Sequence, residues 1–160
     1  GDEQVNFVNA PLIARQRGIR VREVTSEDIE NFANLVTLKI RSGQGTHSLA
    51  GTVFSRNDIR ITQIDDYRIE VMPSPYMLVC YYLDRPGVIG RVGTILGSRE
   101  INIAGMQVGR QSAGGEAVMV LQIDEPATPS ILQEIEQLEE IKSIRQVQLR
   151  GQDMPAVSGD

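Results

Sequence analysis

The chain has 160 residues, of which 41% are hydrophobic and 4% aromatic, and its 16 Lys and Arg against 21 Asp and Glu give a net charge of −5. This length fits one ordinary domain or two small ones, and the acidic balance argues against nucleic acid or anionic lipid as a partner, because both bind basic surfaces. No apolar run approaches the roughly 20 residues that span a bilayer, and no signal-peptide pattern opens the chain. We therefore expect a cytoplasmic protein with no membrane partner.

Side chains that commonly carry catalysis or bind metals are scarce. Cys80 is the only cysteine and lies in an apolar run, so we expect it to behave as a small buried hydrophobe, with no disulfide or iron–sulfur site. The only histidine, His47, falls in the polar segment SGQGTHS (42–48), where we expect a solvated turn residue. We therefore expect no metal site, no cofactor on this chain and no self-contained enzyme.

The first half of the chain predicts a mostly antiparallel β module with a short helix. Asn9 can cap this helix, Pro11 suits its first turn, and Gly18 can end it. A second short helix, begun by Ser26, is expected over residues 26–34. Strands, separated by segments rich in turn-forming residues, are expected over residues 19–25, 35–41, 48–55, 59–64 and 67–72.

The second half of the chain predicts an α+β fold. The two prolines of MPSPY (72–76) mark a boundary, because neither can donate to a sheet ladder. Beyond them the order of elements is β-α-β-β-α-β, which is the ferredoxin-like arrangement. The final segment, residues 151–160, shows no periodicity and we expect it to be disordered. The expected strands cover residues 77–83, 101–110, 117–124 and 144–149, and the expected helices cover residues 87–99 and 128–140.

The stretch LDRPGVIGRVGTILG (83–97) joins the first of these strands to the first helix. Its glycines match neither the dinucleotide fingerprint nor the phosphate loop, and it contains no lysine. The N–H groups at a helix N-terminus attract a carboxylate, while Asp84 can receive an ammonium group, so together they suit a free amino acid. Gly87 leaves the backbone open to such a ligand. The alternative is that Asp84 only caps the helix, and that Gly90 and Gly93 only allow close helix packing.

Two further polar side chains stand out near this stretch. Tyr82 precedes Asp84 by two residues on the same strand face, and its ordinary role is packing, with the hydroxyl bonded to a local partner. Asn102 is an amide within the apolar strand INIAG. It offers both a donor and an acceptor to a polar ligand, or it pairs with a neighbouring turn.

A family resemblance covers most of the chain. The run YYLDRPGVIGRVGTILGSREINIAGMQVGR (81–110) resembles an ACT domain, the βαββαβ module that senses amino acids. With FVNAPLIARQRGI (7–19) and GTVFSRNDIRITQIDDYRIEV (51–71), it is similar to the C-terminal half of D-3-phosphoglycerate dehydrogenase. The resemblance implies a partial intervening (allosteric-substrate-binding) domain over residues 1–74, an ACT domain over 75–150 and a disordered tail over 151–160.

In that family two ACT domains pair side by side into a continuous sheet, and L-serine binds at their interface as an end-product inhibitor. Several members carry His and Asn where this chain has Tyr and Asp, so affinity or preference would differ here. The resemblance implies an L-serine site made of Tyr82, Asp84 and the partner chain's Asn102, with the backbone of Arg85, Pro86, Gly87 and Val88.

The family's intervening domain can also hold an anionic effector in a basic patch near the ACT domain. Arg60 falls at a matching position, and Arg56 and Arg68 lie near it in the sequence. Met72 and Gln122 stand where other members carry arginine, which favours the alternative that these arginines are solvated surface residues.

The resemblance predicts a regulatory fragment of an NAD-dependent oxidoreductase of L-serine biosynthesis. It implies feedback inhibition by L-serine, a homodimer or tetramer formed through ACT domains, and catalytic domains of the parent chain, which bind NAD, as partners. The absent initiator methionine and the abrupt start fit a truncated piece. Two alternatives remain open: a regulatory module of an iron–sulfur L-serine dehydratase, with its cluster on another chain, and a purely structural oligomerisation module.

Overall fold

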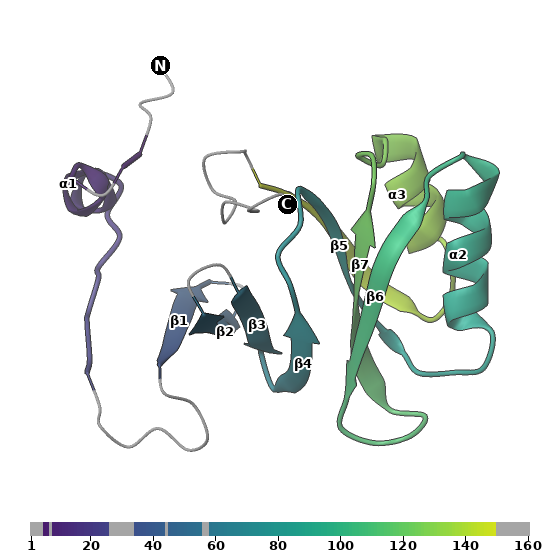
Figure 1. Cartoon of the computed structure of the whole chain (residues 1–160), viewed down its shortest axis with the longest axis horizontal. Helices are drawn as coiled ribbons and strands as arrows, with labels where there is room; N and C mark the ends of the chain where they lie inside the picture. The colour runs from purple at the N-terminus through teal and green to yellow at the C-terminus, as the bar shows by residue number, and fades with distance from the viewer. Residues whose placement is uncertain (1–4, 7, 26–33, 44, 56–57, 150–160) are drawn as a thin grey trace. The chain divides into compact units, whose positions relative to one another are not determined.

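The computed structural model describes residues 5–6, 8–25, 34–43, 45–55 and 58–149. The chain divides into two units, residues 1–31 and residues 32–160. The first unit contains helix α1 (Ala10–Gln16), and the second contains the strands and two further helices (Figure 1). None of the helices in the described ranges is long and apolar enough to cross a bilayer.

Helix α1 begins and ends where its sequence predicts. Asn9 occupies the N-cap position, but its side chain makes no capping hydrogen bond and instead accepts one from the Asn6 N–H at 2.7 Å. Pro11 lies in the first turn, where a missing backbone N–H costs nothing. Gly18 follows the helix with a φ of 71°, a left-handed conformation that glycine adopts without strain. The Ile19 N–H then donates to the Ala14 carbonyl at 2.8 Å, which closes the helix end in a Schellman-type motif.

The prediction of a strand over residues 19–25 is wrong. This segment has no regular secondary structure, and Ile19, Val21 and Val24 are exposed. A strand is stabilised by pairing and by packing of one face, and no strand in the described part of the chain pairs with this segment. The helix expected over 26–34 and the tail over 151–160 fall on residues outside the described ranges, except for Asn34.

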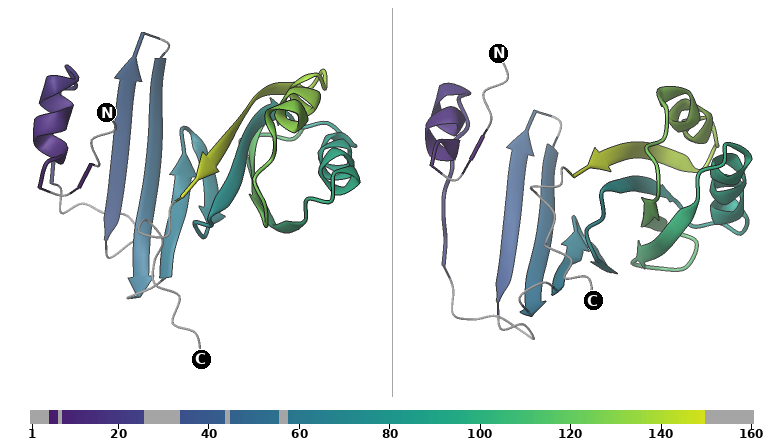
Figure 2. Two further views of the ribbon diagram at one scale, coloured as in Figure 1. Left: turned by 90° about the horizontal axis from the view of Figure 1, so that it is seen from above. Right: turned by 45° about the horizontal axis from the view of Figure 1, so that its top comes forward.

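The first sheet confirms the predicted antiparallel β module. Its strands are paired in the order β1-β2-β3-β4, and Figure 2 shows β1 and β2 as a long hairpin. Pairing of β1 with β2 continues as far as Ser42 and Gly45, so the turn between them is shorter than expected and His47 lies in a strand. The strands are β1 (Leu35–Ser42), β2 (Gly45–Ser55), β3 (Asp58–Ile64) and β4 (Tyr67–Val71).

The second sheet and its two helices confirm the predicted ferredoxin-like fold. Its strands are all antiparallel in the order β6-β7-β5-β8, and both helices cover one face of the sheet (Figure 1). The elements in chain order are β5 (Tyr76–Leu83), α2 (Val88–Ser98), β6 (Ile103–Arg110), β7 (Glu116–Ile123), α3 (Pro129–Glu136) and β8 (Ile141–Gln148).

The period-2 alternation of β5 and β7 serves two cores. On one face, Leu78, Cys80 and Tyr82 pack against the buried side of α2 and α3. On the other face, Met77 and its β7 neighbours pack against apolar residues of β3 and β4. Each fully buried side chain of this size contributes roughly 1.5–3 kcal/mol to the stability of the fold. Packing on both faces therefore stabilises the second sheet. The second core consists of Ile64, Ile69, Val71, Met77, Val118 and Val120.

Strands β1 and β2 continue the apolar face of the first sheet beyond this second core. Val36 and Leu38 of β1 and Val53 of β2 are exposed, and they line a hollow of about 300 Å³ with their neighbours. Only the β3–β4 half of the first sheet contributes side chains to the core that it shares with the second sheet, within the described ranges.

Candidate functional site

Tyr82 and Asp84 lie together at the carboxyl end of β5. The Tyr82 side chain is 0% exposed, and its hydroxyl donates to Oδ1 of Asp84 over 3.5 Å. Burial, with the nearby negative charge of Asp84, raises the pKa of Tyr82 to about 12, so the hydroxyl remains a donor at neutral pH. The Asp84 N–H donates to the Gly115 carbonyl at 2.8 Å, which fixes the backbone beside the hairpin that joins β6 to β7.

Arg110, at the end of β6, completes this group of side chains. Its Nη1 donates to Oδ2 of Asp84 over 3.1 Å. The side chain of Arg110 is 58% exposed, whereas that of Asp84 is 18% exposed. The sequence did not predict this contact, because it depends on the register that places Ala117 of β7 opposite both Arg110 and Tyr82.

The turn after Asp84 leads directly into α2. The Arg85 N–H donates to the Leu83 carbonyl at 2.8 Å, and Gly87 occupies the N-cap position with a φ of 89°. No side chain in the described part of the chain caps α2, so the interpretation of Asp84 as a helix cap is wrong. The Arg-Pro-Gly turn places Asp84 three residues before the N-cap, where its carboxylate bonds to side chains instead.

The glycines inside α2 do not serve close packing. Among the described residues, a Cβ atom added at Gly90 or at Gly93 would meet no atom within 4 Å outside its own stretch of helix, so the packing interpretation of these two residues is wrong within this chain. Gly87 is different, because its positive φ is a conformation that other residues adopt at a cost.

Asn102 lies at the other end of the second sheet. Its Nδ2 donates to Oδ2 of Asp124 at 2.8 Å, which confirms the predicted pairing with a neighbouring turn. Strands β5 and β6 both run antiparallel to β7, so Asp84 follows the end of one strand while Asn102 precedes the start of the other. The length of a strand, roughly 23 Å, separates the two ends. A single chain therefore brings Tyr82 and Asp84 together but not Asn102.

The arginines predicted to bind an anion are spread over β3 and β4. Arg60 is partly buried and forms ion pairs with Asp58 at 3.0 Å and with Glu70 at 3.6 Å. Arg68 lies on β4 and is exposed, while Arg56 lies outside the described ranges. With two carboxylates already beside Arg60, an anion would have to compete for its guanidinium, and an anion site here stays a prediction.

A hydrogen bond joins Met72 and Gln122, the two residues at positions where the resemblance implies arginine in other members. The Gln122 Nε2 donates to the Met72 carbonyl over 2.8 Å. This neutral hydrogen bond links the segment after β4 to β7.

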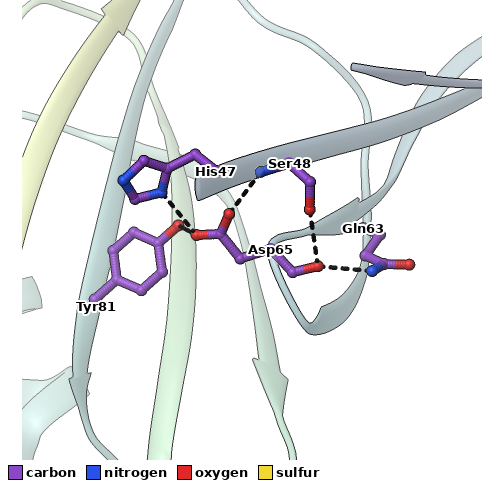
Figure 3. Close-up of polar contacts among 5 residues, drawn as sticks. All are labelled: His47, Ser48, Gln63, Asp65 and Tyr81. Atoms are coloured by element: carbon purple, nitrogen blue, oxygen red, sulfur yellow. Dashed lines mark hydrogen bonds and ion pairs between the residues drawn. The ribbon is translucent and has the colours of Figure 1, made fainter. Parts of the chain in front are cut away.

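A second polar cluster joins the two sheets around Asp65, as Figure 3 shows. Asp65 begins the turn between β3 and β4 and accepts hydrogen bonds from the Tyr81 hydroxyl at 2.6 Å and the Ser48 N–H at 2.7 Å. The Nδ1 of His47 lies 3.2 Å from the same carboxylate. His47 is exposed, as expected, but it lies within β2 and not in a turn, and its ring bonds to Asp65.

The Asp65 carboxylate is stabilised in its ionised form. Burial by itself would raise its pKa, but the hydrogen bonds from Tyr81, Ser48 and His47 outweigh burial and hold the pKa below its usual value. Tyr81 belongs to β5, so this charged hydrogen bond connects the second sheet to the turn of the first.

Cys80 behaves as the sequence predicts. It is fully buried between the sheet and the helices. Burial, with the negative charge of Glu136, raises the pKa of its thiol to about 12, so it is a neutral hydrophobic side chain and not a nucleophile. Within the described ranges, no group of three or more His, Cys, Asp or Glu side chains is arranged to hold a metal ion.

Both halves of the chain match known families. Residues 2–65 match the D-3-phosphoglycerate dehydrogenase intervening domain, and residues 76–140 match the ACT domain. The predicted boundary between residues 74 and 75 stays a prediction.

The chain is also similar to proteins named D-3-phosphoglycerate dehydrogenase. It is 41% identical over 147 residues to that of Synechocystis sp., covering 92% of this chain and 26% of the relative. It is 39% identical over 148 residues to that of Archaeoglobus fulgidus (91% and 28%) and 36% identical over 148 residues to that of Bacillus subtilis (92% and 28%). The chain thus spans 26 to 28% of the length of these relatives.

Proposed function

We propose that this chain, which belongs to the D-3-phosphoglycerate dehydrogenase family, senses L-serine. It forms the C-terminal regulatory region of that family, an intervening domain followed by an ACT domain. L-serine binds between two ACT domains and acts as a feedback inhibitor of the longer enzyme. The relatives' name and the predicted site residues support this proposal, as does the geometry around Asp84.

The end of β5 suits the two charges of a free amino acid. The Asp84 carboxylate is partly exposed and can receive the ligand's ammonium group. The N-terminus of α2, which no described side chain caps, presents backbone N–H groups and the positive end of the helix dipole to a carboxylate. Gly87 carries no side chain that would block this approach.

Asp84 and Asn102 lie at opposite ends of the second sheet, and this is the observation that supports a site made by two copies of the chain. Strand β6 is an edge of the second sheet, and its sequence IAGMQVGR contains neither lysine nor proline to prevent pairing with another strand. If two copies of β6 paired antiparallel, the start of one strand would lie beside the end of the other. Asn102 of a second copy would then approach the end of the sheet that carries Asp84 and Arg110.

Such a site links ligand binding to assembly. Serine held between two ACT domains stabilises the paired arrangement and thereby slows the NAD-dependent domains elsewhere in the longer chain. The size of this inhibition is bounded by the difference in serine affinity between the two arrangements of the oligomer.

A calorimetric titration of L-serine into the folded chain tests the proposal, with D-serine and glycine as control ligands. We expect saturable heat for L-serine, weakened at least tenfold by Asp84→Ala, because the ammonium group loses its counter-charge. Glu134→Ala is the matched control variant, because Glu134 is also an ion-paired carboxylate but lies on α3 and pairs with Arg99.

A different outcome would favour the alternative of a purely structural module. If the chain is folded and dimeric by analytical ultracentrifugation but gives no heat at millimolar L-serine, serine sensing is contradicted. Dimer formation without any response to L-serine would mean that the second sheet only mediates oligomerisation.

A further inference from the structure

We propose that Arg110 binds the α-carboxylate of the amino acid held at Asp84, and so selects zwitterionic ligands over amines that lack a carboxylate. This proposal rests on the proposed function and adds to it a residue that determines specificity. The family resemblance does not include Arg110 among the ligand-binding residues.

Arg110 places a positive charge beside Asp84, the carboxylate proposed to receive the ammonium group of the ligand. It lies at the last residue of β6 and reaches past β7 to Asp84, with 3.1 Å between Nη1 and Oδ2. More than half of the Arg110 side chain is exposed, so the ion pair has one open side on which a ligand can lie.

A second arginine near this turn has a different partner. Arg91 on α2 pairs with Glu140 at 2.6 Å. Arg110 is therefore the arginine that contacts Asp84 within the described part of the chain.

The charges of the ion pair determine which ligands fit beside it. An amine bound at Asp84 would place its positive charge close to the Arg110 guanidinium, and the two like charges would repel each other. A zwitterion can bind with its ammonium group against Asp84 and its carboxylate against the Arg110 guanidinium. Each of these four charged groups then lies beside groups of opposite charge.

The guanidinium also has the donors that this contact needs. It carries five N–H donors, and the hydrogen bond to Asp84 uses one of them. The remaining donors can hold a carboxylate with two parallel hydrogen bonds, the geometry that arginine favours. The N-terminus of α2 then acts beside Arg110 on the same ligand carboxylate.

Two ligands and two variants test this assignment by calorimetry on the full chain. L-serinamide keeps the ammonium and hydroxyl groups of L-serine but replaces the carboxylate with a neutral amide. Arg110→Gln removes the guanidinium from an exposed position, and Arg99→Gln removes an exposed, ion-paired arginine that contacts Glu134 instead. Thermal unfolding of each variant checks that the fold is retained.

We expect the wild-type chain to bind L-serine at least about tenfold more tightly than L-serinamide, because L-serinamide lacks one charge-assisted contact. Arg110→Gln should weaken L-serine binding by about the same factor and leave L-serinamide binding unchanged or tighter. Arg99→Gln should retain the preference of the wild type.

Each other result has a distinct meaning. If Arg110→Gln binds L-serine as tightly as the wild type or more tightly, Arg110 competes with the ligand and the assignment is overturned, while serine sensing stands. If Arg110→Gln weakens the binding of L-serine and of L-serinamide equally, Arg110 only positions Asp84, and the proposed contact with the carboxylate is overturned. If the folded wild-type chain binds no L-serine, the proposed function fails and the role of Arg110 fails with it.

Discussion

Asp84 and Asn102 lie at opposite ends of the second sheet, because the strands that carry them both run antiparallel to β7. A ligand the size of a free amino acid cannot touch both residues of one chain across roughly 23 Å of strand. Two copies related by antiparallel pairing of β6 would bring one residue from each chain together at two equivalent sites. The predicted site residues can therefore meet only between two chains.

The hydrogen bond from Tyr81 to Asp65 should stabilise the contact between the two sheets. Tyr81→Phe removes a 2.6 Å donor to an ionised carboxylate and leaves the ring in place. We expect a loss of about 2 kcal/mol in the free energy of unfolding, as for other hydrogen bonds to charged groups. Urea denaturation followed by circular dichroism measures this loss.

Tyr76→Phe is the matched control for Tyr81→Phe. Tyr76 lies on the same strand, but its hydroxyl is not part of the Asp65 cluster. We expect a change within about 0.5 kcal/mol. Equal effects of the two substitutions would mean that the bond to Asp65 contributes nothing specific.

The stabilisation due to Asp65 should depend on pH. Hydrogen bonds hold its folded-state pKa below the usual value, so the ionised form contributes stability above the unfolded-state pKa of about 3.9. This contribution is lost as the pH falls through the lower, folded-state pKa. We expect Asp65→Asn to destabilise the chain clearly at pH 7 and much less near pH 3.

Urea midpoints of the wild type and Asp65→Asn at both pH values test this dependence. Asp66→Asn changes the adjacent carboxylate, which is not part of the cluster, and should show a smaller difference at pH 7. A destabilisation by Asp65→Asn that is the same at pH 7 and pH 3 would contradict the role of the ionised carboxylate.

Two glycine substitutions should have opposite effects on stability. A Cβ atom at Gly109 would lie 2.7 Å from the Arg68 carbonyl oxygen and 3.1 Å from the Tyr67 Cβ, so β4 would have to move away from β6. We expect Gly109→Ala to destabilise the chain by about 1–3 kcal/mol. Gly93→Ala adds a methyl group in open space within α2 and should stabilise it by about 0.5–1 kcal/mol.

Thermal unfolding of the two variants compares these effects directly. If Gly109→Ala unfolds at the same temperature as the wild type, the close approach of β4 to β6 is not a feature of the folded chain in solution.

Strongly periodic segments were predicted well. The strand and helix patterns of the second half give six elements in the observed order, with bounds that differ by a few residues, because alternation and helical spacing are local properties. The segment 19–25 shows the limit of such patterns. Its apolar residues only partly alternate, and a strand also needs a neighbour with which to pair.

The polar contacts of the site could not be predicted in the same way. Arg110 is 26 residues from Asp84, and their contact depends on the register of two hairpins. Tyr81 and His47 lie 16 and 18 residues from Asp65 and reach it from different sheets. Neither spacing follows a helix or strand period, so only the assembled sheets bring these groups together.

A mixing experiment with two inactive variants tests whether the L-serine site is shared between two chains. Asp84→Ala and Asn102→Ala each remove one half of the proposed site, so each variant alone should bind little or no L-serine. Unfolded together in equal amounts and refolded, they should form about half mixed dimers, each with one intact site of two. We predict L-serine binding at about one quarter of the wild-type number of sites, with wild-type affinity. If the refolded mixture contains mixed dimers but binds no more L-serine than either variant alone, the site is not shared between two chains.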